Sequence, residues 1–318
     1  PRRSSDLALA ACHTSSTAKQ KSLAPPAQPN ILFIYTDDQG YADLACLGHP
    51  RLKTPNIDAL AASGTRFTDF YVACPVCAPS RAAAMTGRDP NRYGMKFLCH
   101  NGQYDASVYH HVPLDEPMLP RQLQAAGYRT GHVGKWHLSI PYYLNDPTPA
   151  DYGFDHALIL PPEGRSIYKN PTNWSRNGQT VEGILAPWSD ELLVDESIRF
   201  IGGCQGQPFY LNFWTFTPHE DIITPLEYQA MYEGLTDQEK IYYGALTHLD
   251  DQLGRLFQYL KDNSLWDNTI IVYASDNGPE NALLPWITNS SGSTGPFRGA
   301  KHVIYEGGIR VQIGRAHV

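Results

Sequence analysis

The segment from Cys77 to Arg88 combines a possible nucleophile with cations. It reads C-A-P-S-R-A-A-A-M-T-G-R, so Arg81 follows Cys77 by four residues. If this segment is helical, positions i and i+4 share one face, and the sulfur and the guanidinium would point to the same side. Cys74 and Cys77 also form a C-x-x-C pair, but no second pair completes a zinc site and no thioredoxin-like context precedes it. Taken alone, Cys77 could equally be a small buried apolar residue.

Two pairs of oxygen-bearing side chains follow two predicted strands. Asp37 and Asp38 come after one apolar run, and Asp276 and Asn277 come after another. Ligand groups collect at the carboxyl ends of strands in open α/β sheets, which is where these residues would lie. Oxygen ligands suit Ca²⁺ or Mg²⁺ and disfavour zinc. A single aspartate at a strand end could merely cap the next helix, but two pairs favour a metal site.

Three further side chains could move protons or bind an anion. Lys135 and His137 alternate in the segment G-K-W-H-L, so both would point to one side if that segment is extended. His219 follows an aromatic, strand-like run. A lysine is often only a surface charge, and a lone histidine is often structural, so these three need support from elsewhere in the sequence.

Helical and strand patterns alternate along most of the chain. Continuous apolar runs predict buried strands, and spacing of three to four residues predicts helices. The strands are expected at 31–35, 128–133, 209–216 and 269–274, and the helices at 54–64, 119–126, 190–201 and 237–260. This order predicts an α/β sandwich around a mostly parallel sheet. Residues 141–188 show little periodicity and are expected to form long surface loops.

The composition fits a packed protein and excludes several classes. Hydrophobic residues make up 42% of 318, and charged residues make up 18%. The formal net charge is -7 with no basic run, which argues against nucleic-acid binding. No stretch of 18 uncharged apolar residues exists, so no intact transmembrane helix is expected. Six cysteines in this length do not make a disulfide scaffold.

The motif that starts at Cys77 resembles the signature C-x-P-S-R-x-x-x-x-T-G-R of the type I sulfatases, and it departs only at Met85, where that family usually has Leu. The resemblance covers residues 30–311 and is nearest to the branch of arylsulfatase A and N-acetylgalactosamine-6-sulfatase. The other segments that carry it are P-N-I-L-F-I with D-D-Q-G (29–40), T-P-N-I-D (54–58), G-K-W-H-L (134–138), S-D-N-G (275–278), G-P-F-R-G-A-K (295–301) and E-G-G-I-R (306–310).

The resemblance implies a fold and a set of roles. The fold would be the alkaline-phosphatase-like α/β/α sandwich with a mostly parallel central sheet. Cys77 would be converted to formylglycine, an aldehyde, by a separate maturation enzyme. His137 would act as general base, and His219 as leaving-group acid and sulfate contact. The cations around the sulfate would be Arg81, Lys135 and Lys301, and the ligands of Ca²⁺ (or Mg²⁺) would be Asp37, Asp38, Asp276 and Asn277.

The implied activity is hydrolysis of sulfate monoesters, on a sulfated carbohydrate. One alternative is a phosphonate or phosphate monoester hydrolase, since some relatives of sulfatases have that activity. Another is a non-catalytic binder of sulfated glycans, which would need a broken set of site residues. All of the matched positions are filled here, which favours the enzyme.

The two ends of the chain carry separate expectations. Residues 1–29 are expected to be a flexible leader, a remnant of an export signal. L-A-A-C, ending at Cys12, resembles a lipoprotein cleavage box, but Asp6 interrupts the apolar stretch that should precede it, which argues against lipidation. We expect an exported protein, whether periplasmic, secreted or lipid-anchored.

The segment 313–318 resembles the translation of a sequencing adapter, and the alternative is a native loop with the same residues. We therefore expect 312–318 to be a non-native tail. On this interpretation the catalytic domain, 30–311, is incomplete and lacks the small C-terminal domain of the family.

Overall fold

A nine-stranded sheet organises the computed structural model, which describes residues 28–95, 111–139, 146–160, 167–280, 290–311 and 313–314. The strand order is β2-β9-β8-β1-β7-β3-β4-β5-β6. The strands are β1 (Asn30–Thr36), β2 (Arg66–Phe67), β3 (Arg129–Gly134), β4 (His156–Ile159), β5 (Thr172–Arg176), β6 (Gln179–Ile184), β7 (Phe209–Trp214), β8 (Thr269–Ser275) and β9 (Ile313–Gly314). Cys12 and most of the predicted leader and tail lie outside the described residues.

The centre of the sheet is parallel. β1 pairs in parallel with β7 on one side and β8 on the other, and β3 pairs in parallel with β7 and β4. The antiparallel pairs lie towards the two edges, where β8 meets β9 and where β4, β5 and β6 follow one another. Leu32 and Ile34 of β1 are fully buried, as expected of a strand covered on both faces. The predicted mostly parallel α/β sheet is confirmed.

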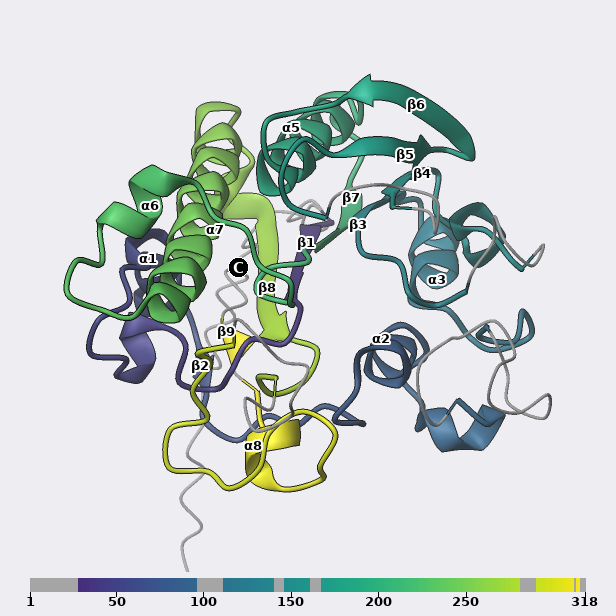
Figure 1. Cartoon of the computed structure of the whole chain (residues 1–318). Helices are drawn as coiled ribbons and strands as arrows, with labels where there is room; N and C mark the ends of the chain where they lie inside the picture. Colours follow the sequence, from purple (N-terminus) through teal and green to yellow (C-terminus); the bar gives the residue numbers. More distant parts are fainter. Residues whose placement is uncertain are drawn as a thin grey trace, which may run out of the picture.

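Helices cover both faces of this sheet (Figure 1). The α-helices are α1 (Pro55–Ala62), α2 (Cys77–Thr86), α3 (Leu119–Ala125), α5 (Ser189–Gly202), α6 (Leu226–Ala230), α7 (Asp237–Asp262) and α8 (Glu306–Ile309), and the 3₁₀ turns are Ala45–Leu47, Pro90–Tyr93, Pro149–Tyr152 and Trp266–Asn268. One apolar cluster joins α1, α5 and α7 to the sheet, and a second joins α2 and the residues near α3 to it. Together they make the α/β/α sandwich.

In helix α7, the apolar residues at helical spacing pack into the core. The apolar residues at helical spacing in its sequence are Ile241, Ala245, Leu249, Leu253, Leu256 and Leu260. All of them are buried except Ile241, near the start of the helix, which is half-buried. The helix begins with a capping box, in which the Thr236 hydroxyl and the Glu239 carboxylate each bond the backbone of the other. Among the described residues, no helix is both long and apolar enough to cross a membrane.

The prediction of long loops over 141–188 was wrong for much of that segment. β4, β5 and β6 lie there and extend the sheet through antiparallel pairs. Asn177 and Gly178 join β5 to β6, and both have positive φ, 51° and 83°. Asn-Gly is the preferred pair for a tight hairpin turn, so this dipeptide was the missed signal. Residues 140–145 and 161–166 lie outside the described part of the chain.

Candidate active site

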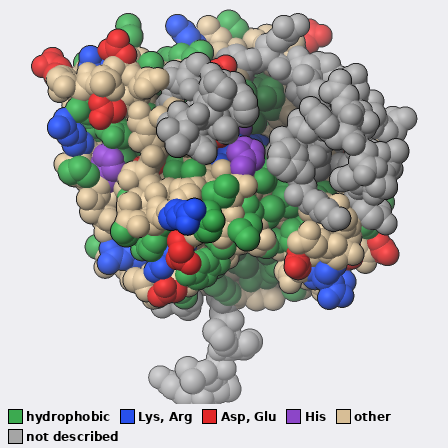
Figure 2. Space-filling view, turned by 60° about the horizontal axis from the view of Figure 1, so that its bottom comes forward, with side chains coloured by type: hydrophobic (Ala, Val, Ile, Leu, Met, Phe, Trp, Pro, Cys, Tyr) green, Lys and Arg blue, Asp and Glu red, His purple; other side chains and the backbone are tan. Residues whose placement is uncertain are grey.

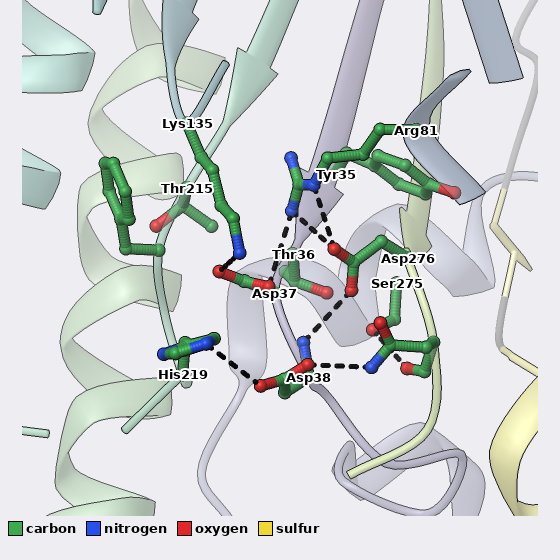
Figure 3. Close-up of polar contacts among 12 residues, drawn as sticks. Tyr35, Thr36, Asp37, Asp38, Arg81, Lys135, Thr215, His219, Ser275 and Asp276 are labelled. Atoms are coloured by element: carbon green, nitrogen blue, oxygen red, sulfur yellow. Dashed lines mark hydrogen bonds and ion pairs between the residues drawn. The ribbon is translucent and has the colours of Figure 1, made fainter. Parts of the chain in front are cut away.

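The two oxygen-rich pairs lie side by side at the carboxyl ends of neighbouring parallel strands. Thr36 and Ser275, the last residues of β1 and β8, are partners in register. The Asp38 amide donates to Oδ1 of Asp276 at 3.1 Å. Asn277 Nδ2 donates to Oδ1 of Asp38 at 2.7 Å, and Figure 3 shows the contact between Asp38 and Asp276. The strand-end rule predicted that these residues would lie close together, and these two hydrogen bonds show that they do.

Cys77 and Arg81 come from the first turns of α2. Cys77 is its first residue and Arg81 lies one turn later, so the segment is helical and the condition under which the two share a face is met. Their exposed fractions are 1% and 0%. The Cys77 sulfur lies within 4.8 Å of carboxylate oxygens of Asp37 and Asp276. Burial raises the pKa of the Cys77 thiol to about 11, although Lys135 nearby opposes this shift.

The Arg81 guanidinium is enclosed by carboxylates and aromatic rings. Its Nε and Nη2 lie 2.9 and 2.7 Å from Oδ2 of Asp276, and Nη2 lies 3.6 Å from Oδ1 of Asp37. The rings of Trp214 and Tyr35 lie 5.0 and 5.4 Å from the guanidinium carbon. Nη1 has no hydrogen-bond partner among the described residues, although it is buried. A planar cation held in this way keeps one donor for an anionic ligand.

Two lysines reach the same carboxylates from other elements. Lys135, which follows β3, places Nζ 2.6 Å from Oδ2 of Asp37. Lys301 places Nζ 2.6 Å from Oδ2 of Asp38 and 2.5 Å from Oε1 of Glu280. Burial alone would lower the pKa of both lysines, but the neighbouring carboxylates outweigh it and raise both values. Both lysines are therefore charged at neutral pH.

The three buried aspartates differ in how well their charges are balanced. Burial opposes ionisation of Asp37 and Asp38, but Lys135 and Lys301 hold the pKa of each below its ordinary value. Burial raises the pKa of Asp276 to about 7, against the opposing effect of Arg81. Additional positive charge beside Asp276 would favour its ionised form.

The two predicted histidines lie at the same end of the sheet. His219, beyond β7, is half-buried and has Nε2 3.6 Å from Oδ2 of Asp38. His137 lies two residues past Lys135, but its φ of 54° means that the segment is not simply extended as we predicted. Burial lowers the pKa of His137 well below its ordinary value, and the charges of Lys135 and Arg81 lower it further. His137 is therefore neutral near pH 7, the form that can accept a proton.

The chemistry of the donors fits a hard divalent cation. Asp37, Asp38, Asp276 and Asn277 supply oxygen atoms, which Ca²⁺ and Mg²⁺ prefer. Oδ1 of Asp37 and Oδ1 of Asn277 are buried and accept no hydrogen bond from any residue that the structure describes. Buried oxygens without donors are costly unless a ligand satisfies them. These two atoms are the observation that favours a cation here.

Sequence reasoning missed Glu280, Tyr35 and Trp214. Glu280 follows Asn277 by three residues in the same strand-end loop, so the strand-end rule could have included it. Tyr35 and Trp214 are buried strand residues whose contact with Arg81 depends on the pairing of β1 with β7. Aromatic residues are common in strands, so nothing in the local sequence distinguishes these two.

Two glycine segments hold the Asp276 loop against α8. The Gly278 amide donates to the Gly308 carbonyl at 2.9 Å. A Cβ on Gly278 would lie only 1.8 Å from the carbonyl oxygen of Gly307, so no other residue fits without moving the backbone. The S-D-N-G and E-G-G segments, far apart in the sequence, are therefore in direct backbone contact.

Comparison with known proteins agrees with this arrangement. The family model described as Sulfatase matches residues 29–313. Arylsulfatase A of Homo sapiens is 33% identical over 324 residues, which cover 91% of this chain and 59% of that protein. N-acetylgalactosamine-6-sulfatase of Homo sapiens is 32% identical over 303 residues, which cover 90% and 56%. The chain thus spans less than two thirds of the length of these curated relatives.

A solved structure extends the likeness to three dimensions. It is described as "Crystal structure of Ps i-CgsB in complex with k-i-k-neocarrahexaose", and it has a TM-score of 0.78 and 31% identity. The match covers 90% of this chain and 65% of that one. Since the family model matches nearly the whole described chain and the relatives exceed 30% identity, the chain belongs to the sulfatase family.

Proposed function

We propose that this chain hydrolyses sulfate monoesters of a sulfated carbohydrate, with Cys77 converted to formylglycine and with a divalent cation at the aspartate cluster. The observation that carries the proposal is the position of the Cys77 sulfur, within 4.8 Å of carboxylate oxygens of Asp37 and Asp276. The site of modification and the oxygen ligands therefore adjoin each other, with Lys135 and Arg81 beside them. The names of the relatives, which include a sulfatase of N-acetylgalactosamine, support a sulfated sugar as substrate.

The nucleophile would be the hydrated aldehyde at position 77. One of its two hydroxyls attacks sulfur and forms a sulfate ester with the enzyme, while the alcohol of the substrate leaves. The second hydroxyl then loses its proton and re-forms the aldehyde C=O, which breaks the C–O bond to sulfate and releases it. A cysteine thiolate has no such second group, which is why an aldehyde suits the task.

Protons and charge are handled by other side chains in this proposal. His137, neutral at pH 7, takes the proton that the diol loses. His219 donates a proton to the leaving oxygen. Arg81, Lys135 and Lys301 stabilise the negative charge on the sulfuryl oxygens. A bound Ca²⁺ or Mg²⁺ would polarise those oxygens, held by Asp37, Asp38, Asp276 and Asn277.

Two cellular features belong to the same proposal. A separate maturation enzyme converts Cys77, because the conversion is not a property of the thiol alone. The proposal also includes export of the protein, which would bring it to sulfated carbohydrates outside the cell. We expect no nucleic-acid partner, since the formal net charge is -7 and the sequence has no basic run.

The test is turnover by the full-length protein produced together with a maturation enzyme. We expect hydrolysis of 4-nitrophenyl sulfate to exceed that of 4-nitrophenyl phosphate, and we expect release of sulfate from defined sulfated saccharides. Faster turnover of the phosphate or a phosphonate would instead favour the alternative monoester hydrolase. Binding of a sulfated saccharide without any turnover would favour the non-catalytic binder.

A further inference from the structure

A buried carboxylate outside the aspartate cluster holds the loop that carries His219. Asp190, the second residue of α5, is only 3% exposed. Its Oδ1 accepts a hydrogen bond from the Thr215 hydroxyl at 2.6 Å, and its Oδ2 accepts one from the Thr217 hydroxyl at 2.8 Å. Each carboxylate oxygen thus fixes one residue of the segment that links β7 to His219.

The same segment is tied to the end of β1. The Thr215 amide donates to the Tyr35 carbonyl at 3.1 Å, and the Thr217 carbonyl accepts from the Asp37 amide at 3.2 Å. The Thr217 amide donates to the Thr215 hydroxyl oxygen at 3.0 Å, which links the two threonines directly. The segment is therefore clamped between the Asp190 carboxylate and the backbone that places Asp37. Figure 3 shows Thr215 on the side of the site where Lys135 and His219 lie.

His219 takes its position from this clamped segment together with Tyr168, whose hydroxyl donates to the Phe216 carbonyl at 3.0 Å and contacts the His219 carbonyl. Its amide donates to the Phe216 carbonyl at 2.7 Å, so the backbone turns back on itself directly after Thr217. The turn leaves the imidazole Nε2 3.6 Å from Oδ2 of Asp38. At this distance, a displacement of the loop by about 1 Å would change the alignment of a proton donor with its acceptor.

The surroundings of Asp190 give it no other partner of comparable strength. His248 of α7 lies 3.8 Å away through Nδ1, which is beyond hydrogen-bonding distance. The other ring nitrogen of His248 faces Glu191 at 3.7 Å. The two threonine hydroxyls are the side-chain hydrogen bonds that Asp190 makes within the described residues, and a buried carboxylate holds such donors strongly.

We propose that Asp190 is a positioning residue for His219, acting through Thr215 and Thr217. The inference rests on the proposed function, since it takes His219 as the acid that protonates the leaving oxygen. It adds a residue that does not touch the substrate but decides how well that proton transfer is aligned.

The experiment compares aryl sulfates whose phenols differ in acidity. A poor leaving group needs a proton from His219, whereas an acidic phenol leaves as the phenolate. General acid catalysis by one side chain is worth about 10²- to 10⁴-fold. We therefore expect Asp190→Ala to lower kcat by about 100-fold for the least acidic phenol and by only a few-fold for 4-nitrophenyl sulfate. The dependence of rate on phenol acidity should become steeper than in the wild type.

Three further variants distinguish a role of Asp190 in positioning His219 from a general disturbance of the structure. Glu191→Gln removes the neighbouring carboxylate on the same helix and should leave the dependence on phenol acidity unchanged. Thr217→Val removes one donor to Asp190 without changing the carboxylate, and it should steepen the dependence less than Asp190→Ala does. Asp190→Ala added to His219→Ala should cost little beyond His219→Ala alone, because both act on one proton transfer.

Two results would overturn the proposal. One is an equal loss of kcat for every phenol in both Asp190→Ala and Thr217→Val, which would indicate a general structural role. The other is a full additional loss from Asp190→Ala in the His219→Ala background. If Asp190→Ala does not fold, Thr217→Val alone decides, and a wild-type dependence on phenol acidity in that variant also overturns the proposal.

A readout without turnover separates this proposal from the proposed function. If the wild type hydrolyses no sulfate ester, the proposed function fails, but the imidazole resonances of His219 can still be observed by NMR. They are assigned by their loss in His219→Ala. Asp190→Ala or Thr217→Val should shift them, and Glu191→Gln should not. Unchanged resonances in the first two variants would overturn the positioning role.

Discussion

The guanidinium of Arg81 contacts a single oxygen of Asp276 through two nitrogens, Nε at 2.9 Å and Nη2 at 2.7 Å, and neither side chain is exposed. The pair joins the first turns of α2 to the end of β8. Because the two ions are fully buried, each depends on the other for compensation of its charge. This contact therefore connects the stability of the fold with the integrity of the candidate site.

Replacing Arg81 with methionine should destabilise the protein and abolish turnover. Removal of one partner from a buried ion pair costs about 3 to 5 kcal/mol, because the remaining charge stays buried. Arg88→Met is the matched control, since Arg88 pairs with Glu116 but has a side chain that is 44% exposed. Its loss should cost less than about 1 kcal/mol. Urea unfolding of both variants measures the difference, and equal losses would contradict this account of the pair.

Glu196 should make the free energy of unfolding depend on pH in the acidic range. Burial alone would raise its pKa, but hydrogen bonds from His156 and Arg176 outweigh burial and lower the pKa from 4.5 to about 2. A carboxylate with a lowered pKa stabilises the fold above its unfolded-state pKa, and that stabilisation is lost as pH falls through the folded-state value. At about 1.4 kcal/mol per pKa unit, the contribution is about 3 kcal/mol at neutral pH.

Glu196→Gln isolates this contribution because glutamine does not titrate. The difference in free energy of unfolding between wild type and variant should be about 3 kcal/mol at pH 7 and should shrink as pH falls from 4.5 to 2. Urea unfolding of both proteins across this range is the measurement. A difference that stays constant with pH would mean that Glu196 is not held in its ionised form by its two partners.

Cys77 should carry an aldehyde in active protein. Resistance to alkylation in the folded protein does not by itself demonstrate the aldehyde. Burial raises the pKa of an unmodified Cys77 to about 11, so even a thiol there would resist alkylation in the folded protein. The protein must therefore be denatured before alkylation. We expect the peptide with Cys77 to react with a hydrazine and not with an alkylating agent, whereas Cys74 is alkylated.

Two alanine variants complete that experiment. Cys77→Ala should eliminate turnover and still bind a sulfated ligand, because Arg81, Lys135 and Lys301 remain. Cys74→Ala should change turnover little. A redox role of the C-x-x-C pair needs both sulfurs, so equally complete loss in the two variants would favour that role over the aldehyde.

A divalent cation should stabilise the folded protein. A ligand at 100 times its Kd adds about 2.7 kcal/mol when it binds only the folded state. Asn277→Ala removes a buried oxygen that accepts no hydrogen bond from the described residues, and it leaves the net charge unchanged. This variant should lose most of the rise in Tm that Ca²⁺ or Mg²⁺ gives to chelator-treated wild type. Asn263→Ala, at the exposed end of α7, should keep the full rise.

The sequence was most informative where one local pattern was decisive. The apolar run of β1 and the stripe of α7 each satisfy a single periodicity, and both elements lie where predicted. The strand-end aspartates followed from a rule about neighbouring positions, whereas the helix at Cys77 was only a condition of the argument about Cys77 and Arg81. Much of the candidate site could be predicted because parallel strands bring their carboxyl ends to one edge.

The remainder depends on contacts between distant segments. The family resemblance named Lys301 as a cation of the site, but its contacts with Asp38, 263 residues away, and with Glu280 have no signal in the local sequence. Asp190 lies in the first turn of a helix, where acidic residues are common, and its bonds to Thr215 and Thr217 have no periodic signature. The positive φ of His137 likewise depends on the local backbone, and the residue type at that position does not predict it.

The position of β1 between β7 and β8 also determines when the site can form during synthesis of the chain. Asp38 and Asp276 bond each other across 238 residues, so the site cannot close until β8 has been synthesised. At the usual rate of about 5 to 20 residues per second, that interval lasts roughly 10 to 50 s on the ribosome. During the interval Cys77 lacks Asp276, the neighbour that follows β8 and lies beside its sulfur in the folded protein. If Cys77 is modified as proposed, the modifying enzyme would have its best access to the sulfur in a nascent chain, before the sheet is complete.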